Sequence, residues 1–423
     1  MSQSKLLIKS GTVVCKGNST TADILVEDGV IARIAEHIEA DNQTEIFDAS
    51  GCIVTYGLAD VHVHLREPGF SEKETIATGT AAAARGGFTT VCSMPNLNPA
   101  PDSVENIAIQ QDIIDRTALI EVRPFATITK SRIGSEVVDV EALMPHCVGF
   151  SDDGTGVQDE NTMLAAMKRI AAAGGIIAAH CEDERLLFGG YIHEGEYAAV
   201  HNHKGICCQS EWGPIARDTE LVEKSGCRYH ICHMSAAGSV EALRNAKRRG
   251  LQMTGETGPH YLTMTDMDIE ENGRFKMNPP IRSAVDRAAL IEGIKDGTIE
   301  VIATDHAPHT AEQKGKGLAG SAMGVVGLET SFAVIYTKLV REGIITIEKA
   351  IELMSENPRR IFNLGGALKE GERADIAIFD TTTPFTVDPA LFLSKGKATP
   401  FEGWELYGQC VLTLYGGKAV WRA

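Results

Sequence analysis

Positive charge is scarce in this 423-residue chain, and its cysteines are not regularly spaced. Lys and Arg number 40 against 57 Asp and Glu, so the formal net charge is −17. Without a basic excess the chain has little with which to neutralise phosphates, so neither a nucleic acid nor an anionic membrane surface is an expected partner. The 10 cysteines include no Cys-x-x-Cys pair. That usage is typical of a reducing cytoplasm rather than of a disulfide framework.

Long apolar runs are missing as well. The segment from Met1 to Lys9 contains no apolar stretch of the length that a secretory leader needs. The longest mostly apolar run, residues 170–179, is far shorter than a membrane-spanning helix. We therefore expect a cytoplasmic protein without a membrane partner. Apolar residues make up 43% and charged residues 23% of the chain, an ordinary globular composition that permits a large core.

Both ends of the chain are patterned as short strands separated by turns. The expected strands are residues 5–9, 11–14, 22–26, 30–34, 45–49 and 52–55 near the N-terminus, and 374–379 and 411–421 near the C-terminus. We expect these two ends, residues 1–55 and 366–423, to meet in one small β-sandwich.

The middle of the chain, residues 56–365, alternates short apolar strands with longer segments of helical period. The expected strands are residues 59–65, 88–94, 121–128, 147–151, 176–180, 229–233, 251–256 and 301–305. Helices fit between them, for example at 74–85, 161–173, 239–249 and 287–294. This count predicts an α/β fold, a (β/α)8 TIM-type barrel carrying the small sandwich. A doubly wound open sheet is the competing topology, but no Gly-x-Gly-x-x-Gly directly follows a strand.

The strongest chemical signal is a His-x-His pair in the first of these middle strands. Side chains two residues apart on a strand face the same way, so His62 and His64 project together and can chelate a metal ion. A buried structural pair is the alternative interpretation. The pair lies at the C-terminal end of the strand, where barrel active sites are built, and this position favours the metal site.

Four other strand ends carry residues of the same kinds. Strand four ends at Asp152 and Asp153, strand five at His180, strand six at His233 and strand eight at Asp305. Each alone is explained by helix capping or solvation. Together with the histidine pair they place His and Asp on one rim of five barrel strands, and these are the ligand types of a zinc-like divalent site.

Two longer stretches resemble the signature segments of the dihydroorotases in the amidohydrolase superfamily. They are residues 57–69, around the histidine pair, and residues 303–314, around Asp305. The similarity extends over nearly the whole chain, through Met94–Asn96, Ala179–Asp183, His230–Ser235, Lys276–Pro280 and Gly324–Glu329. The histidine pair and Asp305 mark only the superfamily. The residues that narrow the resemblance to dihydroorotase are Arg66, Asn96, Asn278 and His309.

The resemblance implies a centre of two divalent metal ions, with zinc as the implied metal. One ion would be held by His62, His64 and Asp305, the second by His180 and His233, and Asp153 would bridge both. Many superfamily members bridge with a carboxylated lysine, whereas strand four here ends in Asp-Asp-Gly and resembles the type I dihydroorotases. Asp153 rather than Asp152 aligns with the bridge, and neighbouring strand residues face opposite ways.

The same resemblance implies a substrate pocket. Arg66 and Asn96 would hold a carboxylate, which a guanidinium matches bidentately. Asp305 would also be the catalytic residue, moving a proton between water and the ring nitrogen. The complete set of implied substrate contacts is His64, Arg66, Asn96, Asn278, His309, and backbone groups of Met323 and Gly324.

The implied activity is the reversible cyclisation of N-carbamoyl-L-aspartate to (S)-dihydroorotate and water, a step of pyrimidine (UMP) synthesis. A different cyclic amide hydrolase, such as an allantoinase or a dihydropyrimidinase, is one alternative, and Arg66, Asn96 and the missing lysine argue against it. The other is an inactive dihydroorotase-like subunit that stabilises an aspartate transcarbamoylase, and the retention of every metal ligand argues against it. A homodimer and a transcarbamoylase partner both stay open.

Several remaining features have plainer interpretations. His230, His260 and His306 are expected to pack beside the ligands rather than to bind metal. The loop histidines expected to be solvated are His193, His201 and His203. Residues 315–322 are expected to be a flexible loop that acts either as a lid or simply as mobile surface.

Overall fold

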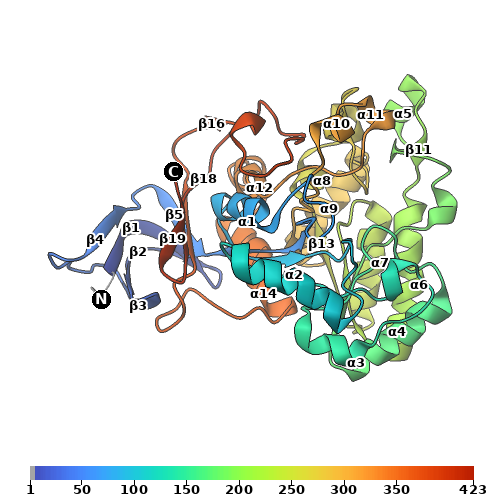
Figure 1. Ribbon diagram of the computed structural model, residues 1–423. Helices are drawn as coiled ribbons and strands as arrows, with labels where there is room; N and C mark the ends of the chain where they lie inside the picture. Colours follow the sequence, from blue (N-terminus) through green and yellow to red (C-terminus); the bar gives the residue numbers. More distant parts are fainter. Residues whose placement is uncertain (1–4) are drawn as a thin grey trace.

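The computed structural model describes residues 5–423 and consists of a sandwich attached to a barrel (Figure 1). The expectation that residues 1–9 contain no secretory leader concerns partly residues 1–4, which lie outside the described residues. Among the residues that are described, no helix combines the length and the apolar character needed to cross a membrane.

The sandwich is one eight-stranded sheet folded over a core of its own, and it takes strands from both chain ends. The strand order is β19-β18-β15-β5-β1-β2-β3, with β4 paired to β1. Ile8 and Ile24 from the N-terminal strands share that core with Ile376 and Leu412 from the C-terminal strands. The strands are β1 (Lys5–Cys15), β2 (Asn18–Glu27), β3 (Val30–Ala35), β4 (Glu45–Asp48), β5 (Cys52–Tyr56), β15 (Ile376–Asp380), β18 (Gln409–Tyr415) and β19 (Lys418–Arg422).

The barrel is built from parallel strands, of which β6 and β7 are buried along their whole length, as is usual when helices cover a parallel sheet. Its strands are β6 (Leu58–Val63), β7 (Phe88–Ser93), β8 (Glu121–Pro124), β9 (Ile176–Ala179), β12 (Arg228–Ile231), β13 (Met253–Thr257) and β14 (Val301–Ile302). They run in the orders β6-β7-β8 and β14-β13-β12-β9. Phe150 bridges the first group to the second, through Ala126 and Ile177. A bridge between Val63 and His306 closes the ring.

The expected fourth strand, residues 147–151, is therefore reduced to a single bridging residue, Phe150. The strands expected at 121–128 and 301–305 also end early, at Pro124 and Ile302. Beyond these ends the pairing continues as single bridges, from Ala126 to Phe150 and from His306 to Val63 and Val325.

Helices surround the barrel, and several begin with side-chain caps that the sequence supplies. Thr75 and Thr78 form a capping box at the start of α1, and Ser283 and Asp286 form another at α9. The helices are α1 (Ile76–Arg85), α2 (Val104–Thr117), α3 (Val140–Leu143), α4 (Glu160–Ala172), α5 (Glu196–His201), α6 (Gln209–Ser225), α7 (Ala237–Arg248), α8 (Pro259–Thr263), α9 (Ala284–Asp296), α10 (Ala311–Lys314), α11 (Gly317–Gly320), α12 (Ser331–Ile335), α13 (Ile347–Ile351) and α14 (Asn357–Ile361).

Shorter elements complete the chain. Two π turns, η6 (Tyr336–Val340) and η7 (Glu352–Glu356), follow α12 and α13 directly. The 3-10 turns are η1 (Lys130–Arg132), η2 (Met144–His146), η3 (Glu184–Leu186), η4 (Asp266–Asp268), η5 (Gly273–Phe275) and η8 (Pro389–Leu391). The short strand pairs are β10 (Ile192–His193) with β11 (Gly205–Ile206), and β16 (Phe385–Thr386) with β17 (Glu405–Leu406).

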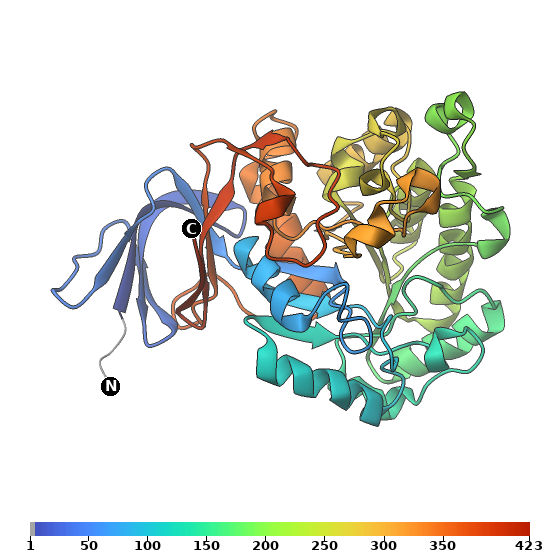
Figure 2. The ribbon, with the colours of Figure 1, turned by 45° about the horizontal axis from the view of Figure 1, so that its top comes forward.

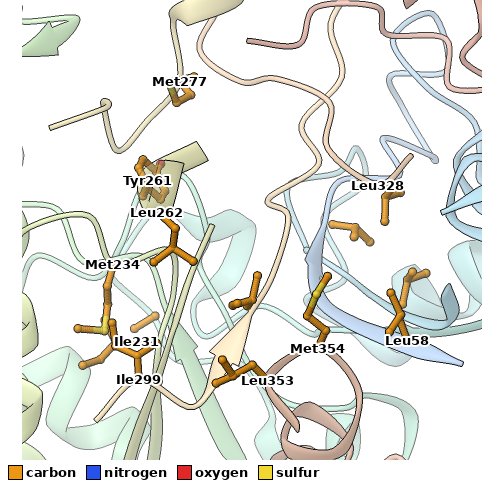
Figure 3. Close-up of a cluster of buried hydrophobic side chains, with 14 of the residues drawn as sticks. Leu58, Ile231, Met234, Tyr261, Leu262, Met277, Ile299, Leu328, Leu353 and Met354 are labelled. Atoms are coloured by element: carbon orange, nitrogen blue, oxygen red, sulfur yellow. The ribbon is translucent and has the colours of Figure 1, made fainter. Parts of the chain in front are cut away.

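The main apolar core lies between the barrel strands and the helices around them (Figure 3). Leu58 and Ile231 come from barrel strands, whereas Leu353 and Met354 come from the helix that follows α13. All four are fully buried. This packing sets the positions of the strand ends, on which the site residues lie.

One C-terminal segment leaves the sandwich and packs along the barrel (Figures 1 and 2). After β15 the chain passes through β16 and η8, and the amide of Val326 then donates to the carbonyl of Ala398. We refer to residues 381–404 as the strap. The predicted division between sandwich and barrel, at residues 55/56 and 365/366, stays a prediction.

Candidate active site and metal centre

Six predicted ligands, carried on five strand ends, converge at one rim of the barrel. His62 lies on β6 and His64 just beyond it, while Asp153, His180, His233 and Asp305 follow the positions of strands four, five, six and eight. The backbones of His233 and Asp305 are left-handed, with φ of 35° and 47°. Such conformations are uncommon outside glycine, and here they aim the two side chains back over the rim.

Asp153 stands at the centre of this cluster. Its Oδ1 lies 3.3 Å from His62 Nε2, 3.7 Å from His180 Nδ1 and 3.6 Å from His233 Nε2. Its Oδ2 lies 3.5 Å from His64 Nε2. Asp153 belongs to two sets of candidate ligand atoms that lie within 4.8 Å of one another, one with His62 and His64 and the other with His180 and His233. This shared position is the geometry that a bridging carboxylate requires.

Asp305 completes the side of the cluster formed by the histidine pair. Its Oδ1 lies 3.0 Å from His64 Nε2 and 3.4 Å from His62 Nε2. On the opposite side, His180 Nδ1 lies 2.8 Å from His233 Nε2. Neutral imidazole and carboxylate groups at these separations match the donors that bind zinc-like ions.

Unpartnered polar atoms support a cation in this cluster. His62 Nε2 and Asp153 Oδ1 are buried and make no hydrogen bond, although buried polar groups are nearly always paired. Burial lowers the pKa of His62, but Asp153 and Asp305 outweigh this effect and raise it well above its ordinary value. Burial raises the pKa of Asp153, yet His62 and the other histidines hold it well below its usual range. The cluster therefore attracts positive charge, and its residues fit divalent metal.

A carboxylate that the sequence analysis did not single out holds the histidine pair from behind. Glu256 on β13 is buried, and its Oε1 lies 2.7 Å from His62 Nδ1. Its Oε2 lies 3.1 Å from His230 Nε2. A carboxylate on one imidazole nitrogen directs the other toward a metal. The only sequence signal for this role was the position of Glu256 near the end of a barrel strand.

The predicted substrate side begins one hydrogen bond away from the metal ligands. His64 Nδ1 lies 2.8 Å from Asn96 Oδ1, which leaves the Asn96 amide nitrogen free to donate. Arg66 is buried, its Nε donates to the carbonyl of Pro308 at 3.3 Å, and its Nη2 lies 3.5 Å from His309 Nε2. Burial lowers the pKa of Arg66 to about 10, so the guanidinium is still charged at neutral pH.

The other predicted substrate contacts are partly occupied by protein groups. Asn278 Nδ2 donates to Glu182 Oε2 at 3.1 Å, which places this amide beside His180 rather than beside Arg66. His309 Nε2 lies 2.7 Å from the carbonyl of Met323. The amide of Gly324 donates to the carbonyl of Lys276 at 3.1 Å. The substrate roles of these residues stay predictions.

Some histidines behave differently from the expectation. His193 is buried with its Nδ1 3.4 Å from Arg282, and His203 bonds to Glu271 at 2.7 Å, so the expectation of solvated rings is wrong for both. Both lie in the segment around the strand pair β10 and β11, where neighbouring residues cover them. The loop-like sequence of this segment did not predict that burial. His201 is exposed as expected. His260 is buried, and burial lowers its pKa to about 4.

Arg132 is a second residue that sequence reasoning missed. Its Nη1 donates to the carbonyl oxygen of Asp153, and the Thr155 hydroxyl donates to the carbonyl of Arg132 at 3.3 Å. Ser131 and Arg132 are both left-handed, with φ of 51° and 57°. The chain thus bends sharply after the third strand to bring a guanidinium against the backbone of the central aspartate.

Comparison with known proteins assigns this architecture to a family. The dihydro-orotase-like family model matches residues 51–239. Proteins named dihydroorotase from Bacillus cereus (strain B4264) and Bacillus cytotoxicus are each 49% identical over 420 residues, which is 98% of this chain and 98% of theirs. The chain belongs to the dihydroorotase family. Members of this family are metal-dependent cyclic amide hydrolases, and the cluster around Asp153 is its candidate metal centre.

Solved structures of other cyclic amidohydrolases share the fold of this dihydroorotase-family chain. The L-hydantoinase (dihydropyrimidinase) from Arthrobacter aurescens matches with a TM-score of 0.89 at 27% identity, covering 99% of this chain and 96% of that chain. The dihydropyrimidinase from Brevibacillus agri matches with a TM-score of 0.87 at 22% identity, covering 99% and 95%. The predicted barrel with an attached sandwich is confirmed.

Proposed function

We propose that this site interconverts N-carbamoyl-L-aspartate and (S)-dihydroorotate. The observation that carries the proposal is the 2.8 Å contact between His64 and Asn96. It joins the metal-binding cluster to the amide of Asn96, and the buried Arg66, two residues after His64 in the chain, suits a substrate carboxylate. A cyclic amide that carries a carboxylate matches both parts of the site, and the family's name agrees with that substrate.

Two divalent ions, which we propose to be zinc, would be held on either side of Asp153. His62, His64 and Asp305 would bind one ion, and His180 and His233 the other. Ions bound there would polarise the ring carbonyl and make water acidic enough to attack it near neutral pH. Glu256 would keep His62 in the tautomer whose Nε2 faces the ion.

Asp305 is suited to move the proton. Burial raises its pKa, but His62 and His64 outweigh burial and hold it below its ordinary value, so it is a carboxylate ready to accept a proton. In hydrolysis, the water oxygen bonds to the ring carbonyl carbon while Asp305 takes a proton from that water. The ring C–N bond then breaks, and Asp305 returns the proton to the departing nitrogen. Ring closure reverses these steps and releases water.

Arg66 and Asn96 would orient the substrate by its carboxylate. The pKa of neighbouring His309 is lowered to about 3, by burial first and then by Arg66, so its ring is neutral. A neutral His309 adds no second positive charge, and it supports the carbonyl of Met323 at the pocket edge. We propose a cytoplasmic enzyme of pyrimidine synthesis, and both a homodimer and an aspartate transcarbamoylase partner stay open.

The proposal is tested by comparing dihydroorotate with dihydrouracil, which lacks only the carboxylate. Two contacts to a charged group predict discrimination of about 10³-fold or more in kcat/KM. In Arg66→Met, kcat/KM for dihydroorotate is expected to fall by most of that factor. Turnover of dihydrouracil and the amount of bound metal should stay nearly unchanged. Arg116→Met, at an exposed position on α2, is the matched control. Equal turnover of both compounds by the parent enzyme would favour a dihydropyrimidinase instead.

The equilibrium position gives a second check on the substrate pair. Carbamoyl aspartate carries two negative charges and dihydroorotate one, so ring closure consumes a proton. The ratio of ring to open chain should rise tenfold for each unit by which pH falls, while no other group titrates. Quantifying both compounds after equilibration at several pH values measures this ratio, and a ratio independent of pH would rule out the pair.

A further inference from the structure

A buried lysine on the substrate side of the site makes an unusual set of contacts. Lys314, the last residue of α10, is 7% exposed. Its Nζ donates to the carbonyls of Lys276 at 2.9 Å, Ala322 at 2.8 Å and Gly324 at 2.7 Å. All three N–H donors of the ammonium are thereby used, and none of the three acceptors is a carboxylate.

Such an arrangement is costly to maintain. Burial, and then the charge of nearby Lys276, lower the pKa of Lys314 to about 7. A buried cation is normally paired with an anion, because desolvation of an unpaired charge is unfavourable. The partners that the ammonium has are three backbone carbonyls, so its contacts link the backbone at Lys276 to the backbone at Ala322 and Gly324.

A second buried lysine ties the same loop down from the other side. Lys276 Nζ donates to the carbonyl of Ala319 at 2.8 Å and lies 5.1 Å from the ring centre of Tyr191. The Ser321 hydroxyl donates to the carbonyl of Lys314 at 2.8 Å, and Leu318 is buried. Residues 314–324 are thus fastened to the segment around Lys276, and α11 contacts η5, the turn that ends just before Lys276.

The fastened loop ends at the substrate pocket. Met323 accepts from His309 Nε2 at 2.7 Å, and His309 in turn lies beside Arg66. Gly324 has φ of 129°, and a Cβ there would come within 2.7 Å of the Ala307 carbonyl. The Gly324 side of this turn leaves no room for a side chain that could anchor it. Its backbone is held instead through the Gly324 carbonyl, which accepts from the ammonium of Lys314.

We propose that Lys314, with Lys276, forms a clamp that positions Met323 and Gly324 at the substrate pocket. In this arrangement Lys314 is a positioning residue, and the loop is a fixed wall rather than a lid. Only the predicted kinetic effect of the clamp rests on the proposed function. Displacement of this wall should weaken substrate binding. It should leave metal binding and the proton transfer by Asp305 unchanged, because the metal cluster and Asp305 lie outside the clamp.

Hydrogen exchange tests the clamp without reference to activity. In Lys314→Met, the amides of Ala322 and Gly324, which donate to the carbonyls of Gln313 and Lys276, should exchange roughly 100-fold faster than in the parent. Lys316→Met is the matched control, because Lys316 lies in the same loop with its side chain 53% exposed. Unchanged protection of both amides in Lys314→Met would overturn the clamp.

Kinetics then test the positioning role. In Lys314→Met, KM for dihydroorotate should rise about tenfold, with kcat within about threefold of the parent and metal content unchanged. A KM within twofold of the parent overturns this role. If Lys314→Met fails to fold, Lys276→Met replaces it, with faster exchange at Ser321 expected and unchanged exchange counting against the clamp. A parent enzyme without dihydroorotate turnover would sink the proposed function, while the exchange result would still decide the clamp.

Discussion

At the scale of single residues, the support of each metal ligand matters as much as the ligand itself. Glu256 contacts His62 at 2.7 Å and His230 at 3.1 Å through its two oxygens. His230 also contacts the hydroxyl of Thr254 at 2.8 Å. The tautomer of His62 is therefore set by Glu256 on β13, which His230 on β12 holds in place. The His-x-His motif alone does not determine it.

Glu256→Gln should weaken metal binding about 10- to 100-fold. The glutamine keeps the shape of the side chain but offers one acceptor instead of two, so one imidazole loses its partner. Competition with a chromogenic chelator measures the affinity. Thr254→Val is the matched control, because it removes a contact to His230 only. A metal affinity within threefold of the parent in Glu256→Gln would contradict the assigned role.

At the scale of elements, one buried carboxylate joins three distant parts of the chain. Glu74 lies just before α1 and is fully buried. It accepts from the amide of Lys395 at 3.2 Å and from the hydroxyl of Ser394, both in the strap. Its Oε2 also lies 3.4 Å from His306 Nε2, next to Asp305. The strap is thereby held on the barrel close to the site, although it begins and ends in the sandwich.

The pKa of Glu74 predicts a pH-dependent contribution to stability. Burial raises this pKa, but contacts from His306, Ser394 and Thr78 outweigh burial and place it below the ordinary value of 4.5. The contribution is therefore present above pH 4.5 and is lost as pH falls through the folded-state pKa. Glu74→Gln should lower the free energy of unfolding by about 2–4 kcal/mol at pH 7, and by less at pH 4.

Urea unfolding at the two pH values measures this difference. Glu72→Gln, at an exposed position two residues earlier, is the matched control and should leave the free energy of unfolding unchanged. The same loss at pH 4 and pH 7 in Glu74→Gln would show that packing rather than charge sets the effect.

At the scale of the whole molecule, the metal cluster ties together strand ends that are far apart in the chain. His62, Asp153, His180, His233 and Asp305 lie on five different strand ends of one closed barrel. In the unfolded chain these residues cannot bind as a set. An ion that binds only the folded state stabilises it by about 2.7 kcal/mol when its free concentration is 100 times its dissociation constant.

Removing metal with a chelator should therefore lower the thermal unfolding midpoint by roughly 5 °C or more. Asp153→Ala should show a lowered midpoint already and no further response to the chelator, because the central ligand is gone. Scanning calorimetry with and without chelator measures both. An identical chelator response in parent and variant would show that Asp153 does not contribute to metal binding.

The sequence by itself determined features that depend on local pattern. Strand alternation placed His62 and His64 on one face, and helical period located α1 and α4 to within two residues of their ends. The return of short strands at the C-terminus predicted the sandwich, and the run of strand-end His and Asp predicted the rim. These features follow from neighbours in the chain, so no long-range information was needed.

Only the tertiary structure decided which distant groups support the site. Glu256 on His62, Arg132 on Asp153 and the three carbonyls on Lys314 are contacts between segments that no sequence period relates. The enclosure of His193 and the route of the strap were likewise set by how the elements pack. Packing brings unlike segments together according to shape and unmet hydrogen bonds, which the order of residues along one segment does not reveal.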